Sequence, residues 1–217
     1  MGSAETSHFN LALYPQDAKL ANACTALAQA NFNEQVSEYL LGENARPHVT
    51  LCQFQANEQQ LESIWSAVEK LELEKKLELE KELELDGKQE RKSKLALDSN
   101  LKALSLRFHH FYIKPGFQLH QDKYWLGLAI SATPELLSLQ KALHTLLAQM
   151  NIESPTLPQS YFPHLTLARC HSVDYANPPL LRVLPALEIW QQDFVFQVSL
   201  GRSNEYGVYS EQLRPLI

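Results

Sequence analysis

Short runs of apolar and β-branched residues recur along the chain and predict β-strands. These runs cover residues 9–15, 47–54, 103–113, 123–131 and 162–170, and a closing strand pair flanks Asn204 and Glu205. Proline or glycine lies at the ends of several runs, as is typical of strand boundaries.

Three stretches have the spacing of an amphipathic helix. The first follows Asp17, which suits a helix N-cap, and the second covers residues 58–70. The third begins with Thr133 at the cap and Pro134 at the first helical position. Helices and strands mixed in this order predict an α+β fold, and no apolar run approaches the roughly 18 residues of a membrane span.

The segment 69–94 breaks this pattern. It repeats LELEKK, LELEKE and LELDGK, and it holds nine acidic and eight basic residues. Its leucines alternate as in a strand, yet Glu and Lys favour helix, and on a helix these leucines form no stripe. We interpret the segment as a low-complexity charged insertion, either an extension of the preceding helix or a solvated arm. A protein-docking arm is the functional alternative.

The amino-acid composition and net charge exclude several classes of protein. The 217 residues are 45% hydrophobic and 20% charged, which is typical of a globular domain. A net charge of −6 argues against a non-specific binder of duplex nucleic acid, so an anionic ligand needs a local site. Cys24, Cys52 and Cys170 form no CxxC pair, and the start MGSAETSHF has no secretory pattern. We therefore expect reduced thiols in a cytoplasmic protein.

A pentapeptide occurs twice, as PHVTL at 47–51 and PHLTL at 163–167. Each histidine of these motifs follows its helix cap by 31 residues, so the strand–helix–strand context repeats as well. This repetition implies two lobes of similar build in one domain that spans 1–217. We place lobe 1 at about 8–68, lobe 2 at about 123–190, and shared strands at 103–113 and 192–210.

The repeated residues suit acid–base chemistry. Side chains two apart on a strand project to the same face, so each motif presents its histidine and threonine together. If the lobes face each other, two imidazoles and two hydroxyls converge. One histidine can act as base and the other as acid near neutral pH, while threonine hydroxyls donate to phosphate oxygens. This set suits in-line displacement at a phosphodiester without a metal ion.

Two HxT motifs in two related halves resemble the 2H phosphoesterase superfamily. PHLTLAR at 163–169 is similar to its bacterial branch of 2′-5′ RNA ligases and cyclic phosphodiesterases. The resemblance covers nearly the whole chain outside 69–94. It implies a bilobal fold with antiparallel sheets around a central cleft, helices on the outside, and no metal or cofactor. The catalytic residues it implies, with the histidines as acid and base and the threonines as phosphate binders, are His48, Thr50, His164 and Thr166.

The implied activity is hydrolysis of 2′,3′-cyclic phosphates or 2′-5′ phosphodiester bonds in nucleotides or RNA ends, as in RNA processing. Two alternatives stay open: RNA ligation by the reverse reaction, and a nucleotide- or RNA-binding module without turnover. We expect a monomer whose partner is this substrate, with no membrane and no obligatory protein partner.

Further substrate-binding candidates each have a plainer alternative. Arg169 lies five residues after His164, so on a regular strand it faces away and would be a surface arginine; a bulge would bring it to the phosphate. Arg202 and Ser203 follow a predicted strand and could line the rim of the cleft. Tyr161, with Phe162 beside it, could stack on a base or pack in the core.

On the predicted strand, Cys52 shares a face with His48 and Thr50. A zinc site of His48, Cys52 and His164 has no matching ligand spacing, and a small buried thiol explains the cysteine equally well. His109 and His110 are adjacent, so on a regular strand they would point to opposite faces.

Overall fold

The computed structural model describes residues 6–32, 36–71, 103–116, 123–171, 183 and 188–215. Strands and helices share one hydrophobic core, which confirms the predicted α+β class. From residue 72 onward the predicted insertion lies outside the described residues, so its interpretation stays a prediction. In the described part of the chain, no helix has the length and apolar character needed to cross a membrane.

Each predicted strand is present, and the run 103–113 is two strands rather than one. The elements in chain order are β1 (Ser7–Pro15), α1 (Ala18–Phe32), β2 (Val36–Leu40), β3 (Val49–Ala56), a helix at 58–71, β4 (Ala103–Leu106), β5 (Phe108–Pro115), β6 (Lys123–Ile130), α4 (Pro134–Gln149), a 3-10 turn η2 (Pro158–Ser160), β7 (His164–His171), α5 (Glu188–Gln191), β8 (Phe194–Ser203) and β9 (Tyr209–Pro215). Strand β2 and the short helix α5 were not predicted.

Both predicted helix caps are confirmed. The Thr133 hydroxyl accepts a hydrogen bond from the Leu136 amide at 3.3 Å, with Pro134 at the first position of α4. The Asp17 carboxylate accepts from the Lys19 amide at 2.8 Å where α1 begins. These bonds satisfy amides that the helix itself leaves without partners, and they fix where each helix starts.

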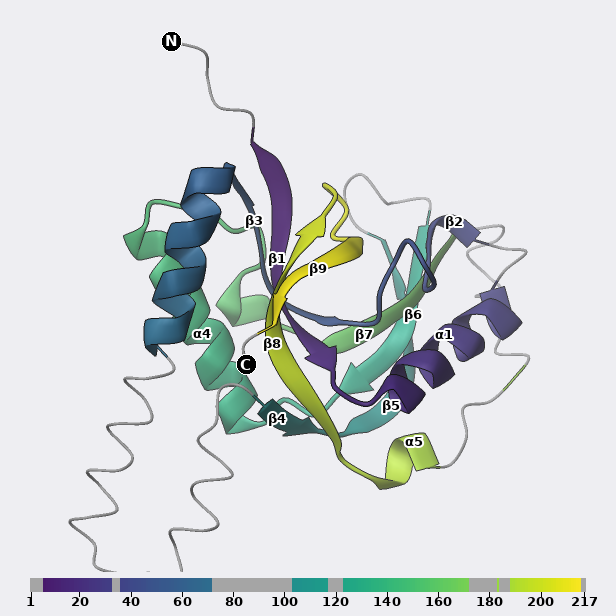
Figure 1. Ribbon diagram of the computed structural model, residues 1–217. Helices are drawn as coiled ribbons and strands as arrows, with labels where there is room; N and C mark the ends of the chain where they lie inside the picture. The colour runs from purple at the N-terminus through teal and green to yellow at the C-terminus, as the bar shows by residue number, and fades with distance from the viewer. Residues whose placement is uncertain are drawn as a thin grey trace, which may run out of the picture.

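The strands form one antiparallel sheet in the order β4-β8-β1-β3-β7-β6-β5, with β2 pairing with β7 and β9 with β8 (Figure 1). Within the described residues, β3 and β7 join through the single pair Val49–Leu165. The sheet thus has two halves that meet at one point, and each residue of that point lies between the histidine and the threonine of its motif.

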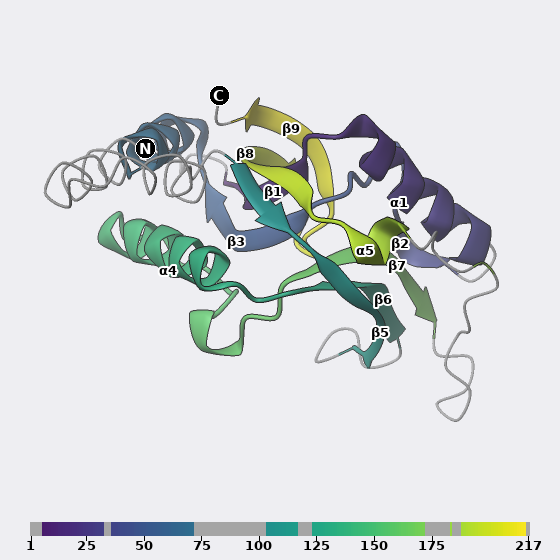
Figure 2. The ribbon, with the colours of Figure 1, turned by 90° about the horizontal axis from the view of Figure 1, so that it is seen from below.

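Helices α1 and α4 each cross to the other half of the sheet. Helix α1 follows β1 but packs on β7, and Phe32 near its end stacks on Phe111 of β5 at 6.3 Å between ring centroids. Helix α4 follows β6 but packs on β3, so the two helices lie near opposite ends of the curved sheet (Figures 1 and 2). Buried helix faces therefore hold the halves together where the strands pair least. The lobe boundaries given above stay a prediction.

Candidate active site

Each pentapeptide ends on a β-bulge. On β3 the extra residue is Leu51, directly after Thr50, and on β7 it is Leu167, directly after Thr166. A bulge places two residues opposite one on the neighbouring strand and changes which face the following side chains occupy. The last leucine of each pentapeptide is thus the bulge residue, so the repeat is a repeat of backbone geometry as well as of side chains.

The four motif side chains gather where the halves meet. Residues on either side of the Val49–Leu165 pair project to the sheet face opposite to that pair. If the antiparallel register continues by one residue on each side of this pair, each histidine lies opposite the threonine of the other motif. His48 then faces Thr166, and His164 faces Thr50. The two imidazoles are close enough for the charge of His164 to act on His48, so both face one site. We call this surface the motif face.

Each motif histidine is oriented by the carbonyl group two residues before it. The Nδ1 atom of His48 lies 2.8 Å from the Arg46 oxygen, and that of His164 lies 2.6 Å from the Phe162 oxygen. A carbonyl oxygen only accepts, so Nδ1 donates, and in the neutral ring Nε2 is then the basic nitrogen. Both neutral rings therefore have the same tautomer, with the proton on Nδ1 and the lone pair on Nε2.

Burial lowers the pKa of both imidazoles. For His48 the pKa falls to about 4, because desolvation and the charge of His164 outweigh its bonds to the Arg46 and Gly207 carbonyls. For His164 desolvation again lowers the pKa, the Phe162 carbonyl opposes the shift, and the Lys114 charge adds to it. Both rings are consequently neutral at pH 7 in the free protein, and a bound anion would raise both pKa values.

Tyr112 of β5 reaches the second motif across β6. Its ring centroid lies 5.2 Å from that of His164, and its hydroxyl oxygen lies 3.5 Å from Thr166 Oγ1. The ring passes over Gly127, where an added Cβ would lie 2.7 Å from the ring carbon Cε1. The same Cβ would lie 2.3 Å from the Leu165 backbone oxygen, so glycine at this position permits both the close approach of β7 and the contact of the tyrosine with the motif side chains.

Tyr209 of β9 has a related role at the first motif. Its ring is stacked on His48 with 5.0 Å between centroids, and its hydroxyl lies 2.8 Å from Ser199 Oγ. It passes over Gly201, which leaves no room for a side chain. Sequence reasoning missed both tyrosines because no local pattern shows that a ring spans a neighbouring strand.

Arg169 lies on the motif face, contrary to the expectation for a regular strand. The bulge shifts the register so that Arg169 pairs with Trp125, which lies two residues along β6 from the partner of Thr166. Its side chain is fully buried, and its guanidinium carbon lies 5.1 Å from the Trp125 ring and 4.9 Å from that of Tyr206. The surface interpretation is therefore wrong, and the bulge that would bring the arginine to the motifs is present.

The equivalent bulge turns Cys52 away from the motif face. Cys52 pairs with Leu11, and both side chains are fully buried in the core. Desolvation raises the pKa of this thiol. The expected face shared with His48 is therefore wrong. Among the described residues, no three His, Cys, Asp or Glu side chains lie close enough to hold a metal ion.

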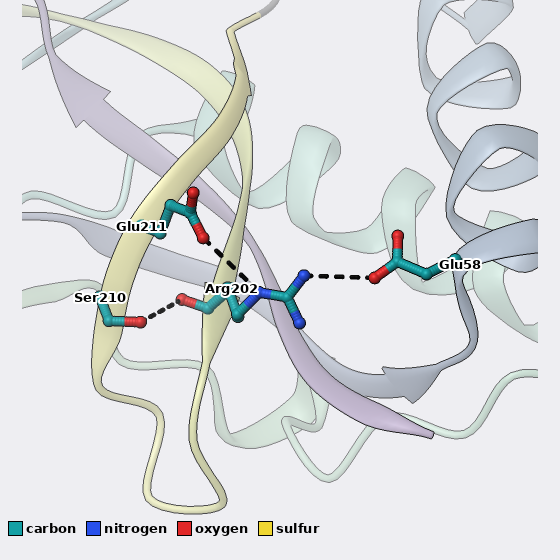
Figure 3. A network of polar contacts seen from close by, with 4 residues as sticks. All are labelled: Glu58, Arg202, Ser210 and Glu211. Atoms are coloured by element: carbon teal, nitrogen blue, oxygen red, sulfur yellow. Dashed lines mark hydrogen bonds and ion pairs between the residues drawn. The ribbon is translucent and has the colours of Figure 1, made fainter. Parts of the chain in front are cut away.

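Arg202 lies on the face of the sheet opposite to the motif face, and Figure 3 shows its contacts with Glu58, Ser210 and Glu211. It pairs in register with Phe9, whose side chain is buried in the core. Its guanidinium binds Glu58 at 3.2 Å and Glu211 at 3.6 Å, while the Ser210 hydroxyl donates to its backbone oxygen. The structure does not bring Arg202 to the motif histidines.

Ser203 lies on the motif face but supports a loop. Its hydroxyl donates to the Asn10 side-chain oxygen at 3.2 Å, and the Asn10 amide donates to the Gly207 carbonyl at 3.4 Å. Tyr206 of the same β8–β9 loop contacts Arg169 in the other half of the sheet. The loop thus spans the two halves beside the motifs.

The two aromatic residues before the second motif, Tyr161 and Phe162, have different surroundings. Tyr161 packs against the core, and its hydroxyl is buried with no hydrogen-bond partner among the described residues. Burial raises the pKa of this phenol, and Cys52 contributes to the rise. Phe162 instead stacks on His164 with 5.4 Å between centroids. The core alternative therefore fits Tyr161, and the ring beside the motif is that of Phe162.

Strand β5 carries a third bulge, at His109. Phe108 pairs with Ile130 and His110 with Ala129, so His109 is the extra residue. The two adjacent imidazoles approach to 2.7 Å between their Nδ1 atoms, and both are exposed. The expectation that they point to opposite faces is therefore wrong, for the same physical reason as at Cys52 and Arg169.

A cavity of about 580 Å³ lies farther along β1 and β3. Its lining includes His8, Gln53, Gln55, Asn151 and Glu205, and none of the four motif residues. This cavity is therefore separate from the candidate active site.

No protein-family model matches the chain, and no curated protein matches its sequence. Solved structures do match. The crystal structure of a phosphoesterase aligns with a TM-score of 0.53 at 15% identity, covering 97% of this chain and 97% of that chain. Usb1 of Kluyveromyces marxianus with uridine monophosphate aligns with a TM-score of 0.39 at 12% identity, over 78% of this chain and 74% of its own. The PDE domain of MHV ns2 aligns with a TM-score of 0.38 at 11% identity, covering 95% of this chain and 99% of that chain.

The first of these alignments spans almost the whole of both chains. The chain therefore has the fold of a phosphoesterase, which confirms the predicted architecture. Its low sequence identity limits the likeness to the fold, so the chemistry must be argued from the motif residues.

Proposed function

We propose that this protein is a phosphodiesterase of the 2H phosphoesterase type that hydrolyses 2′,3′-cyclic phosphates or 2′-5′ phosphodiester bonds in nucleotides or RNA ends. The observation that carries the proposal is the duplicated His–Thr pair on either side of Val49–Leu165, the one β3–β7 pair among the described residues. The fold shared with a phosphoesterase supports the broader assignment to phosphodiester chemistry.

In the proposed reaction, the neutral imidazole of one motif histidine takes a proton from water at Nε2 as the water oxygen bonds to phosphorus. The bond from phosphorus to the leaving ribose oxygen breaks, and the other histidine, protonated in the complex, gives that oxygen its proton. The roles exchange in the reverse direction. The lowered pKa values keep a neutral base present at pH 7, and the substrate's negative charge favours protonation of the acid.

The threonine hydroxyls of the motifs donate to the non-bridging oxygens, where negative charge gathers in the transition state. Arg169 adds a fixed positive charge on the same face, and because its side chain is fully buried, it attracts the phosphate through its electric field. Its stacking between Trp125 and Tyr206 holds it in place before substrate binds. These groups supply the binding of phosphate without a metal ion in the proposed mechanism.

The test is a substrate panel of 2′,3′-cyclic nucleotides and 2′-5′ dinucleotides, read by phosphorus NMR, with wild type, His48→Ala and His164→Ala. The proposal predicts turnover that EDTA does not reduce, and a loss of at least about 10²-fold in each variant. His8→Ala is the matched control, because His8 lines the separate cavity. Wild-type turnover in either motif variant would overturn the assignment. Tight binding with no product would instead favour a module without turnover.

A further inference from the structure

Strand β5 presents two basic side chains beside the second motif. Across β5, β6 and β7 the register aligns His110 with Ala129 and His164, and it aligns Lys114 with the partner of Arg169. Residues aligned across antiparallel strands share a face, so His110 and Lys114 lie on the motif face. Since β5 ends the strand order of the sheet, this row lies at its edge.

These groups form a basic cluster with His109. The bulge brings His109 within 2.7 Å of His110, and the Lys114 ammonium lies 3.3 Å from the centre of the Phe162 ring. Phe162 stacks in turn on His164, so one ring separates the ammonium from the motif histidine. All three basic side chains are exposed. In a chain of net charge −6, such a cluster is a local attraction for an anion.

Electrostatic repulsion among the three basic side chains also favours a bound anion. The pKa of His110 is lowered by desolvation and by the charges of His109 and Lys114. An anion between these side chains would relieve the repulsion and restore protonation of His110. The cluster is therefore a favourable position for a negative charge.

We propose that His110 and Lys114 bind the phosphate next to the one that is cleaved, so that the preferred substrate carries a second phosphate, as an oligonucleotide end does. This inference rests on the proposed function. Neighbouring strands lie about 4.7–4.9 Å apart, so β5 is about 10 Å from β7. A lysine side chain and one nucleotide together span that gap. The cleaved phosphate already has the motif threonines and Arg169, which leaves the β5 cluster for the next one.

Two substrates that differ only in the second phosphate test this directly. They are one nucleoside 2′,3′-cyclic phosphate with a 5′-hydroxyl and the same compound with a 5′-phosphate. For the wild type we expect the 5′-phosphate to raise kcat/KM about tenfold, chiefly through KM, with the gain shrinking as salt increases. In Lys114→Ala the gain falls to about twofold or less, and in His110→Ala it falls partway.

The control is Lys141→Ala, which removes the same charge from an exposed site on α4 and should keep the wild-type gain. Equal kcat/KM for the two substrates in the wild type, or an unchanged gain in Lys114→Ala, would overturn the inference. Calorimetric titration with the phosphomonoester products, with and without the 5′-phosphate, compares binding to the two compounds without turnover. A selective loss of binding in Lys114→Ala would support the subsite even if hydrolysis of every substrate failed.

Discussion

The buried imidazole of His48 makes the protein sensitive to acid. The pKa of His48 is about 4 in the folded state, whereas an unfolded histidine titrates near 6.5. Between these values the unfolded chain binds more protons than the folded protein, so the free energy of unfolding falls as pH decreases. The stability linked to His48 is therefore fully present above pH 6.5 and is lost progressively down to about pH 4.

The magnitude follows from the two pKa values. Proton linkage for one such group lowers the free energy of unfolding by about 2 kcal/mol between pH 7 and pH 5, and by about 3 kcal/mol by pH 4. In His48→Gln this contribution disappears, because the amide does not titrate but can still donate to the Arg46 carbonyl. The variant should therefore lose about 2 kcal/mol less than the wild type on going from pH 7 to pH 5.

Urea unfolding followed by far-UV circular dichroism at both pH values measures the difference. An effect of 2 kcal/mol moves the midpoint by about 1 M urea. Other histidines with lowered pKa values, such as His164, contribute in the same direction in both proteins and cancel in the comparison. If the wild type and the variant lose stability in parallel, His48 is not held neutral by burial, and the argument for its role as a base at pH 7 fails.

Three further substitutions test the site. Thr166→Val should lower kcat by about 10²-fold, as expected for a lost oxyanion donor, with little change in the urea midpoint. A kcat equal to that of the wild type would show that this hydroxyl does not take part in the reaction. Tyr112→Phe keeps the ring against His164 but loses the hydroxyl near Thr166, so kcat should fall by several-fold at constant KM; a change in KM alone would contradict a positioning role. Gly127→Ala should lower the free energy of unfolding by about 1–3 kcal/mol, because its Cβ would lie 2.3 Å from the Leu165 backbone oxygen and 2.7 Å from the Tyr112 ring; an unchanged urea midpoint would contradict this close packing.

Features set by nearby residues could be predicted from the sequence. The caps at Asp17 and Thr133 depend on side chains that bond within a few residues, and both are present. The strands that carry the motifs follow from apolar runs bounded by proline. The two-half arrangement could be predicted because the repeat supplied a second copy of the same local pattern.

Features set by long-range packing could not be predicted in this way. The bulge at Leu167 places Arg169 on the motif face, yet a bulge depends on the neighbouring strand and has no fixed sequence pattern. Tyr112 and Tyr209 reach the histidines across glycine-bearing strands, which requires knowing the strand order. The crossing of α1 and α4 is likewise a property of the assembled halves.

The central claim is that the two halves present their imidazoles to a single phosphate group. Histidine side-chain NMR, recorded while a nucleoside 2′-phosphate is titrated into the protein, tests this most directly. The structure predicts that one equivalent of ligand shifts the Nε2 signals of His48 and His164 together, with both resonances moving toward the protonated form. Shifts at one histidine alone, or separate shifts that need two equivalents of ligand, would contradict it.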